Sequence, residues 1–63
     1  MSKYDWLYGM NAGEAMHVTS YDVSDKIQAK RIRQRIYGSE RLKYFEWSVV
    51  IHPKEGVIVH RKT

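Results

Sequence analysis

Residues 24–38 read SDKIQAKRIRQRIYG, and this stretch decides the fold that the rest of the chain can adopt. Before its last residue it contains no glycine or proline, and its Lys, Arg, Gln and Ala residues are good helix formers. Ser24 is a favourable N-cap because its hydroxyl accepts a hydrogen bond from a free N–H of the first helical turn. Gly38 is of the residue type that commonly follows the last turn. The pattern therefore predicts a helix over residues 24–37.

The predicted helix has a narrow apolar stripe and a broad basic face. At 100° per residue, Ala29, Ile32 and Ile36 fall within an arc of about 60°, which is typical of a helix that lies on one sheet. Ile27 and Tyr37 lie among the charges of the opposite face. That basic face carries Lys26, Lys30, Arg31, Arg33 and Arg35.

Residues 15–21, before the helix, alternate between apolar and polar side chains. Met16 and Val18 fall on one face, and His17 and Thr19 fall on the other. This alternation predicts a half-buried strand.

Two further alternating stretches, residues 44–52 and 57–61, predict a β-hairpin after the helix. The segment Lys54-Glu55-Gly56 between them is typical of a three-residue loop with Gly56 in the left-handed conformation. The second half of the chain therefore contributes two adjacent antiparallel strands.

The register of the hairpin follows from its apolar side chains. We expect residue 53 to lie opposite residue 57, which pairs Ile51 with Val59. A shift of one residue is rejected because it would place His60 in the core. We expect Trp47 at the centre of the core, facing the helix. The apolar face then consists of Phe45, Trp47, Val49, Ile51, Val57 and Val59.

The predicted order of elements is strand, helix, strand, strand. We expect one small α+β domain over residues 1–63 with β-α-β-β order, in which one helix packs on one face of a three-stranded sheet. A fourth short strand over residues 9–16 remains an open alternative. Residues 1–13 form an irregular aromatic segment, in which Trp6, Leu7 and Met10 cover the core or contact a second copy.

The composition narrows the class of protein. The chain has 63 residues, no cysteine and no aliphatic run longer than three residues. Disulfides, cysteine zinc sites and a thiol nucleophile are thereby excluded. We expect neither a membrane span nor a signal peptide, which indicates a cytoplasmic protein. Because a chain of this length buries only about 60% of its unfolded surface, we also expect a homodimer.

Charge is distributed unevenly along the chain. Residues 1–25 carry one lysine against four acidic residues, a net of −3, whereas residues 26–63 carry ten Lys and Arg against three Glu, a net of +7. Such a split favours a basic surface that meets a polyanion, most often a nucleic acid. The alternative is a basic surface that only keeps the protein in solution.

The basic helix is the candidate binding surface. Its five cations meet no acidic residue four positions on, whereas a helix built only for solubility usually intersperses Glu with Lys. Tyr37 and Tyr44 are candidate stacking platforms for unpaired bases, and together with Ile27 they are candidate contacts for a protein partner. We expect phosphates to be bound by Lys26, Lys30, Arg31, Arg33, Arg35, Arg41 and Lys43.

Few residues suit catalysis or metal binding. The available ligands or general bases are His17, His52 and His60, and the expected register makes His52 and His60 diagonal neighbours on the outer sheet face. No carboxylate spacing completes a zinc signature around them. The chain also has no glycine-rich phosphate loop, no paired carboxylates on one face and no Ser–His pair in a nucleophile elbow. We expect no enzyme activity, no metal, no cofactor and no small-molecule substrate.

Several short pieces over most of the chain form one pattern: an aromatic residue, a Gly-Glu turn, a basic helix, and an aromatic-led hairpin that ends in a basic residue. These pieces are Trp6, Met10, Gly13-Glu14, residues 31–37, Phe45, and Glu55-Gly56-Val57 through Arg61. The pattern is similar to that of a group of small tailed-phage proteins, in which an aromatic residue tends to precede the final arginine, where this chain has His60. The resemblance implies an origin in a phage or mobile element, whose small basic proteins act on nucleic acid or on a host protein.

These observations predict a small nucleic-acid-binding protein, for DNA in preference to RNA, that contacts phosphates through its basic helix. The alternative is a phage-type inhibitor or modulator that docks on an acidic surface of a host protein, in the host cytoplasm. The two functions differ in the role they give to Ile27, which is apolar and adds nothing to phosphate binding.

Overall fold

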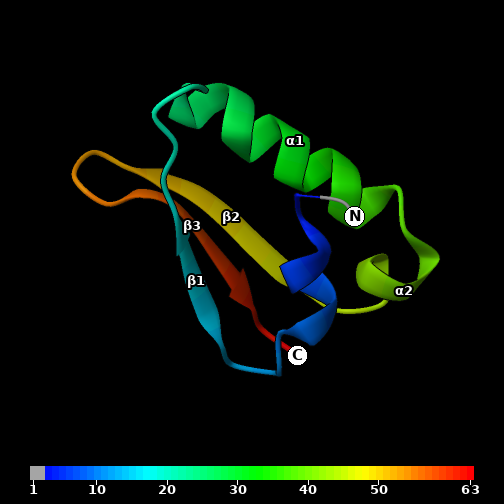
Figure 1. Ribbon diagram of the computed structural model, residues 1–63. Helices are drawn as coiled ribbons and strands as arrows, with labels where there is room; N and C mark the ends of the chain where they lie inside the picture. Colours follow the sequence, from blue (N-terminus) through cyan, green and yellow to red (C-terminus); the bar gives the residue numbers. More distant parts are fainter. Residues whose placement is uncertain (1–2) are drawn as a thin grey trace.

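Three antiparallel strands in the order β1-β3-β2 form the sheet of the computed structural model, which describes residues 3–63 (Figure 1). The predicted α+β class with β-α-β-β order is confirmed. Residues 9–16 add no fourth strand, because they run from a 3₁₀ helix through a turn into β1. In chain order the elements are the 3₁₀ helix η1 (Asp5–Gly9), β1 (Ala15–Val18), α1 (Asp25–Tyr37), α2 (Glu40–Lys43), β2 (Trp47–His52) and β3 (Gly56–Arg61).

Helix α1 begins and ends where the sequence predicts. The hydroxyl oxygen of Ser24 accepts a hydrogen bond from the Ile27 N–H at 3.3 Å. Gly38 follows the last turn, as predicted, and its φ of −86° is not left-handed. A Cβ at this position would lie 2.8 Å from the carbonyl oxygen of Gln34, so close approach requires the glycine.

Helix α2 occupies residues just before β2 and was not predicted. The Ser39 hydroxyl accepts from the Leu42 N–H at 3.3 Å, and the Leu42 side chain is buried. Strand β2 therefore begins at Trp47 rather than at residue 44, and β1 ends at Val18 rather than at residue 21. Phe45 lies outside the strand, with the Arg61 guanidinium 3.5 Å from the centre of its ring.

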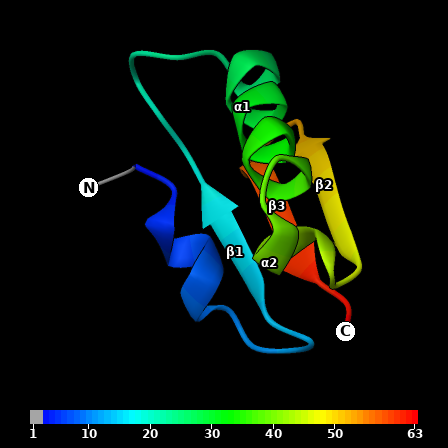
Figure 2. The same cartoon turned by 90° about the vertical axis from the view of Figure 1, so that its right-hand side faces the viewer.

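The helical elements lie on one face of the sheet (Figure 2) and contribute buried side chains to the core there. Helix α1 packs over β2 and β3, and η1 lies next to α1, where the Tyr4 hydroxyl donates to the Gln28 side-chain oxygen at 2.8 Å. The aromatic N-terminal segment therefore covers the core, as the first of the two alternatives predicted. The buried core consists of Leu7, Met10, Ala29, Ile32, Ile36, Leu42, Val57 and Val59.

Trp47 is not the central core residue that the sequence predicted. Its side chain is half-buried and packs against the edge of the core, where the indole N–H donates to the Leu42 carbonyl at 2.7 Å. The centre is formed by fully buried aliphatic side chains, Ile32 and Ile36 of α1 and Val57 and Val59 of β3. Trp47 instead joins β2 to α2.

The hairpin register differs from the predicted one by two residues. Ile51 pairs with Val57 and Val49 pairs with Val59. The predicted pairing of Ile51 with Val59 is wrong, but a shift of two leaves every side chain on its predicted face. Gly56 has a φ of +79°, which confirms the predicted left-handed glycine at the end of the loop.

The outer face of the sheet is not covered by any element within the described residues. It carries Val50 and Ile58, and Val50 remains 49% exposed. Across residues 3–63, no helix has the length and the apolar character that crossing a membrane requires.

Candidate nucleic-acid interface

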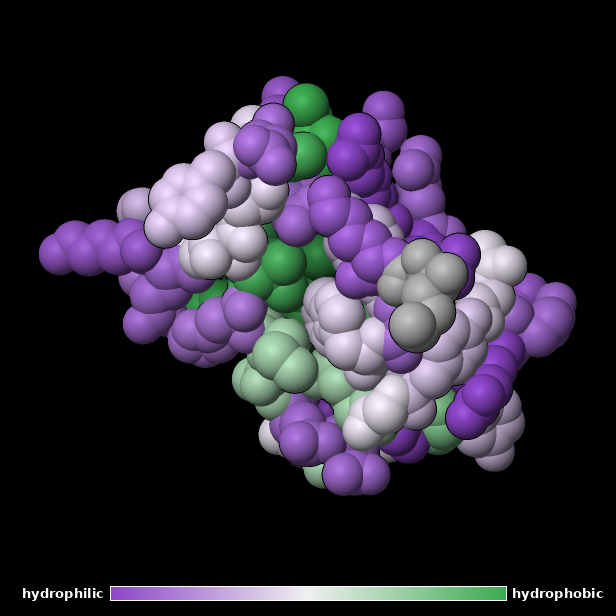
Figure 3. Space-filling view, in the orientation of Figure 1, coloured by the Kyte–Doolittle hydropathy of each residue, from purple (hydrophilic) through white to green (hydrophobic). Residues whose placement is uncertain are grey.

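The exposed side of α1 presents unpaired positive charges. Lys26, Lys30 and Arg31 are exposed, and within residues 3–63 none of their side chains has a hydrogen bond or an ion pair. From residue 26 to the end of α1 the sequence contains no acidic residue. Figure 3 shows hydrophilic side chains along the border of the molecule where α1 runs, with an apolar patch among them.

Arg33 lies beside these residues and contacts the sheet. One of its terminal nitrogens donates to the carbonyl oxygen of Val49 at 2.8 Å, while the side chain remains exposed. Arg33, Lys26 and Lys30 fall within an arc of about 60° on the helix, with Tyr37 in the same arc. We call Lys26, Lys30 and Arg33 the cationic flank, and its Arg33 contacts β2.

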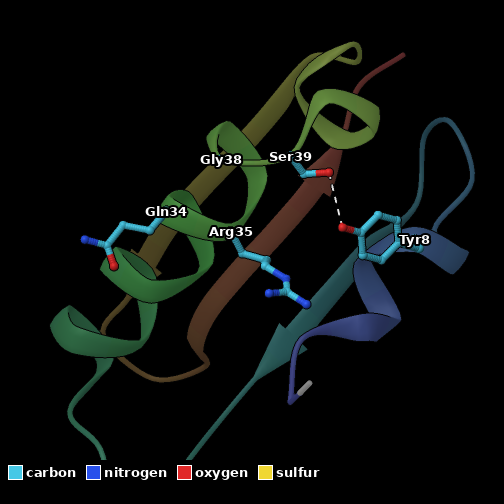
Figure 4. A pocket seen from close by; sticks show the side chains of 5 residues that line it. All are labelled: Tyr8, Gln34, Arg35, Gly38 and Ser39. Carbon is cyan, nitrogen blue, oxygen red and sulfur yellow. Dashed lines mark hydrogen bonds between the residues drawn. The ribbon is translucent and has the colours of Figure 1, made fainter. Parts of the chain in front are cut away.

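Arg35 is directed away from this flank. Its guanidinium forms an ion pair with Asp5 of η1 at 3.2 Å, and its Nε is buried. Figure 4 shows its side chain in a shallow hollow that Tyr8 and Ser39 also line, joined by a hydrogen bond of 3.2 Å between their hydroxyls. Arg35 therefore attaches η1 to α1, and it lies outside the arc of the cationic flank.

The two predicted cations of α2 also have partners. The Arg41 guanidinium lies 5.0 Å from the centre of the Tyr8 ring, and Lys43 pairs with Glu40 at 3.0 Å. Helix α2 follows the C-terminal end of α1 and turns away from it (Figure 1). Arg41 and Lys43 are thus separate from the cationic flank.

The three predicted partner contacts are all exposed. Ile27 is 47% exposed on the solvent side of α1, and Tyr37 is 61% exposed in line with the cationic flank. Tyr44 lies beyond α2, with its ring edge-to-face against Phe45 at 5.2 Å. Only Ile27 and Tyr37 therefore share a surface with the unpaired cations.

Lys54 is a further cation near the N-terminal end of α1, and it was not predicted from the sequence as a binding residue. It is exposed in the β2–β3 loop. A Cβ at Gly56 would lie 3.7 Å from the Asp25 carboxylate, so the loop adjoins the N-terminal end of α1. No sequence signal could reveal this, because the proximity depends on how α1 crosses the sheet.

The three histidines lie on the outer sheet face, where His17 of β1 is a diagonal neighbour of His60 of β3. His52 pairs with Gly56 and His60 pairs with Ser48, so the two are at opposite ends of the hairpin and the predicted diagonal contact is wrong. His52 Nδ1 accepts from the backbone N–H groups of two loop residues at 3.2 Å. His17 Nδ1 lies 3.9 Å from the Glu55 carboxylate. Within the described part of the chain, no group of three or more His, Cys, Asp or Glu residues could hold a metal ion.

Comparisons of the chain with protein-family models, with curated proteins and with solved structures found no match. The similarity to tailed-phage proteins therefore stays a prediction. A function for this protein must therefore be inferred from the geometry of α1 and from the charges that this helix presents.

Proposed function

We propose that this protein binds nucleic acid, DNA in preference to RNA, through the exposed side of α1. The observation that carries the proposal is the set of exposed cations without protein partners, Lys26, Lys30 and Arg31, with Arg33 beside them. Like charges at positions i and i+4 of a helix repel each other, and a bound polyanion would relieve this repulsion. Contacts with phosphates explain the arrangement better than solubility alone.

The dimensions of α1 support duplex DNA as the ligand. The rise of a helix places Lys26 and Arg33 roughly 10 Å apart along its axis, so different side chains of α1 can reach different phosphates of one duplex. The major groove of B-DNA is wide enough for a helix, whereas the deep major groove of A-form RNA is too narrow. Base-specific contacts are not needed, and we expect weak sequence preference.

The salt dependence of binding tests this proposal. Neutralising three or four phosphates gives a slope of about −3 in a plot of log affinity against log salt, so affinity should fall roughly 60-fold between 50 and 200 mM salt. Fluorescence anisotropy with a labelled duplex measures this. If the protein binds neither DNA nor RNA at 50 mM salt, the proposal is wrong.

A charge-matched pair of variants locates the site. Lys30→Gln with Arg31→Gln should reduce the magnitude of the salt slope by about two, because each lost phosphate contact removes about one. Lys43→Gln with Lys62→Gln removes the same charge from α2 and from the residue after β3, and it should leave the slope nearly unchanged. Equal losses in both variants would mean that net charge alone attracts the nucleic acid.

Ile27 supports a second candidate function, the binding of an acidic surface of a host protein. An exposed isoleucine surrounded by cations resembles a protein-contact hot spot. Ile27→Ala should leave phosphate contacts intact but weaken a protein complex by about 1–2 kcal/mol. Pull-down from a host lysate with and without nuclease, using both forms, separates the two functions.

The open outer face supports a homodimer, and the phage resemblance supports action in a host cytoplasm. Val50 is exposed on that face and Ile58 lies beside it, so a second copy would cover apolar surface there. Light scattering tests this part of the proposal. A monomer mass at high micromolar concentration would overturn it.

A further inference from the structure

Strand β2 forms one edge of the sheet, and its backbone groups alternate in direction. Arg61 exchanges hydrogen bonds with residues beside β1, whereas the Lys62 N–H donates to the Glu46 carbonyl on the β2 side. Because direction alternates along an antiparallel strand, Val49 and Ile51 turn their N–H and C=O groups away from β3. The bond from Arg33 to the Val49 carbonyl agrees with this assignment. These outward groups can pair with another strand.

The surroundings of this edge are both cationic and apolar. From α1, Arg33 reaches the Val49 carbonyl, and Lys26 and Lys30 share its side of the helix. Below them Ile51 leaves 46% of its surface exposed, and Tyr37 lies at the end of the row. An extended segment beside β2 would therefore contact carbonyl and N–H groups, apolar side chains and positive charges together.

We infer that the β2 edge binds an extended acidic segment of a partner protein by strand addition. This binding goes beyond nucleic-acid recognition, because it uses the backbone of β2 as well as the charges of α1. Alternate side chains of an added strand point to the same face. Carboxylates at alternate positions of the segment would meet the cationic flank, and the residues between them would lie beside Val50 on the outer face.

Arg33 determines which segment can bind. An added strand must take the Val49 carbonyl from Arg33, which displaces the guanidinium. A carboxylate on the segment re-pairs the displaced cation, and Arg–carboxylate hydrogen bonds are stronger than neutral ones. A neutral segment leaves Arg33 without a new partner. The same contact thus protects the edge from neutral strands and admits acidic ones.

A second copy of this chain is a poorer occupant of this edge. Antiparallel pairing of two β2 strands would place both α1 helices on the same face of the joined sheet. The two cationic flanks, each with Lys26, Lys30 and Arg33, would then oppose each other. Their repulsion disfavours this dimer, whereas charge complementarity favours an acidic partner.

Peptide binding tests the inference directly. The probe is a fluorescent peptide of about nine residues that alternates Glu with Thr, a length suited to a strand. N-methylation at the alternate positions whose N–H faces β2 should weaken binding at least tenfold, and N-methylation at the other positions should have little effect. If both methylated series bind like the parent peptide, no strand is added and the inference is wrong.

Variants of the protein complete the test. Val49→Pro removes an N–H that points away from β3, a change that edge strands tolerate, and it should weaken peptide binding at least tenfold without changing DNA binding. Circular dichroism checks its fold, and the methylated peptides decide the matter if it unfolds. If Val49→Pro instead converts a dimer to a monomer while the peptide does not bind, the occupant is a second copy and the inference fails.

Charge variants separate this site from the proposed DNA surface. Arg33→Ala should reduce the preference for the Glu peptide over a Gln peptide by about fivefold, because the neutral strand no longer displaces a cation. Arg31→Glu, on the solvent side of α1, should weaken DNA binding but change peptide affinity less than twofold. An unchanged Glu-to-Gln ratio in Arg33→Ala would overturn the role of Arg33. The two proposals are therefore tested independently, because DNA binding and peptide binding can each be absent while the other is present.

Discussion

Replacing Gly56 with alanine should lower the free energy of unfolding for two separate reasons. The φ of +79° is left-handed, which costs a non-glycine residue roughly 1–2 kcal/mol. The added Cβ would also lie 2.9 Å from the Val18 carbonyl oxygen and 3.1 Å from the Thr19 methyl group. Relieving such contacts in a packed structure costs about 1–3 kcal/mol more. Because alanine also makes the unfolded chain less flexible, the net backbone cost is about 1 kcal/mol, and Gly56→Ala should destabilise the protein by about 2–4 kcal/mol in total.

Gly13 provides the matched control for this change. Its φ of +85° is nearly the same, but a Cβ there would have no neighbour within 4 Å. Gly13→Ala should cost only about 1 kcal/mol, since the backbone strain is partly offset by a less flexible unfolded chain. Urea unfolding followed by tryptophan fluorescence measures both values. The difference between the variants isolates the steric cost at Gly56.

The two variants should therefore be easy to distinguish. A domain of this size has a stability of about 3–9 kcal/mol, and 1 kcal/mol shifts its melting temperature by about 4–8 °C. Thr19→Ser should recover part of the loss in Gly56→Ala, because it removes the methyl contact but leaves the Val18 oxygen in place. Equal destabilisation of Gly56→Ala and Gly13→Ala would refute the reasoning, because it would mean that the strand contact costs nothing.

Three further changes probe the core, an ion pair and a helix cap. Ile36→Ala should cost about 2–5 kcal/mol because it leaves a cavity in the core, whereas Ile27→Ala should cost less than about 0.5 kcal/mol; thermal unfolding compares the two. A double-mutant cycle with Asp5→Ala and Arg35→Ala should give a coupling of about 0.2–1 kcal/mol that decreases in 1 M salt, and a zero coupling would mean that the pair does not attach η1. Ser24→Ala should lower the free energy of unfolding by about 1 kcal/mol through loss of the N-cap, as urea unfolding would show, and an unchanged stability would contradict that role.

The helix and the faces of the strands could be predicted because their signals are local. Ser24 and Gly38 bound α1, and the alternation in β2 and β3 fixes which side chains point inward. The pairing of Ile51 could not be fixed in the same way. Side chains repeat every two residues, so registers that differ by two bury the same face and the pattern cannot distinguish them.

The candidate site was predicted less well because charge pairing is a long-range property. Helical periodicity places Arg35 on the basic face of α1, yet its partner Asp5 is 30 residues away in the sequence. Arg33 contacts the backbone of β2, and a bond to a carbonyl leaves no trace in residue types. Lys26, Lys30 and Arg31 remain exposed as predicted because they lie on the side of α1 that is directed away from the core.

The central position of β3 has a consequence for the order in which the protein can fold during synthesis. Both β1 and β2 are made before β3, and neither has a neighbouring strand in the sheet until it arrives. Val18 pairs with Val57, so roughly 2–8 s of translation separate the two partners at about 5–20 residues per second. Helix α1, with 13 residues, is only marginally stable by itself in water. The nascent chain therefore stays open until β3 emerges, and during that interval its apolar strands are accessible to chaperones and to other nascent chains.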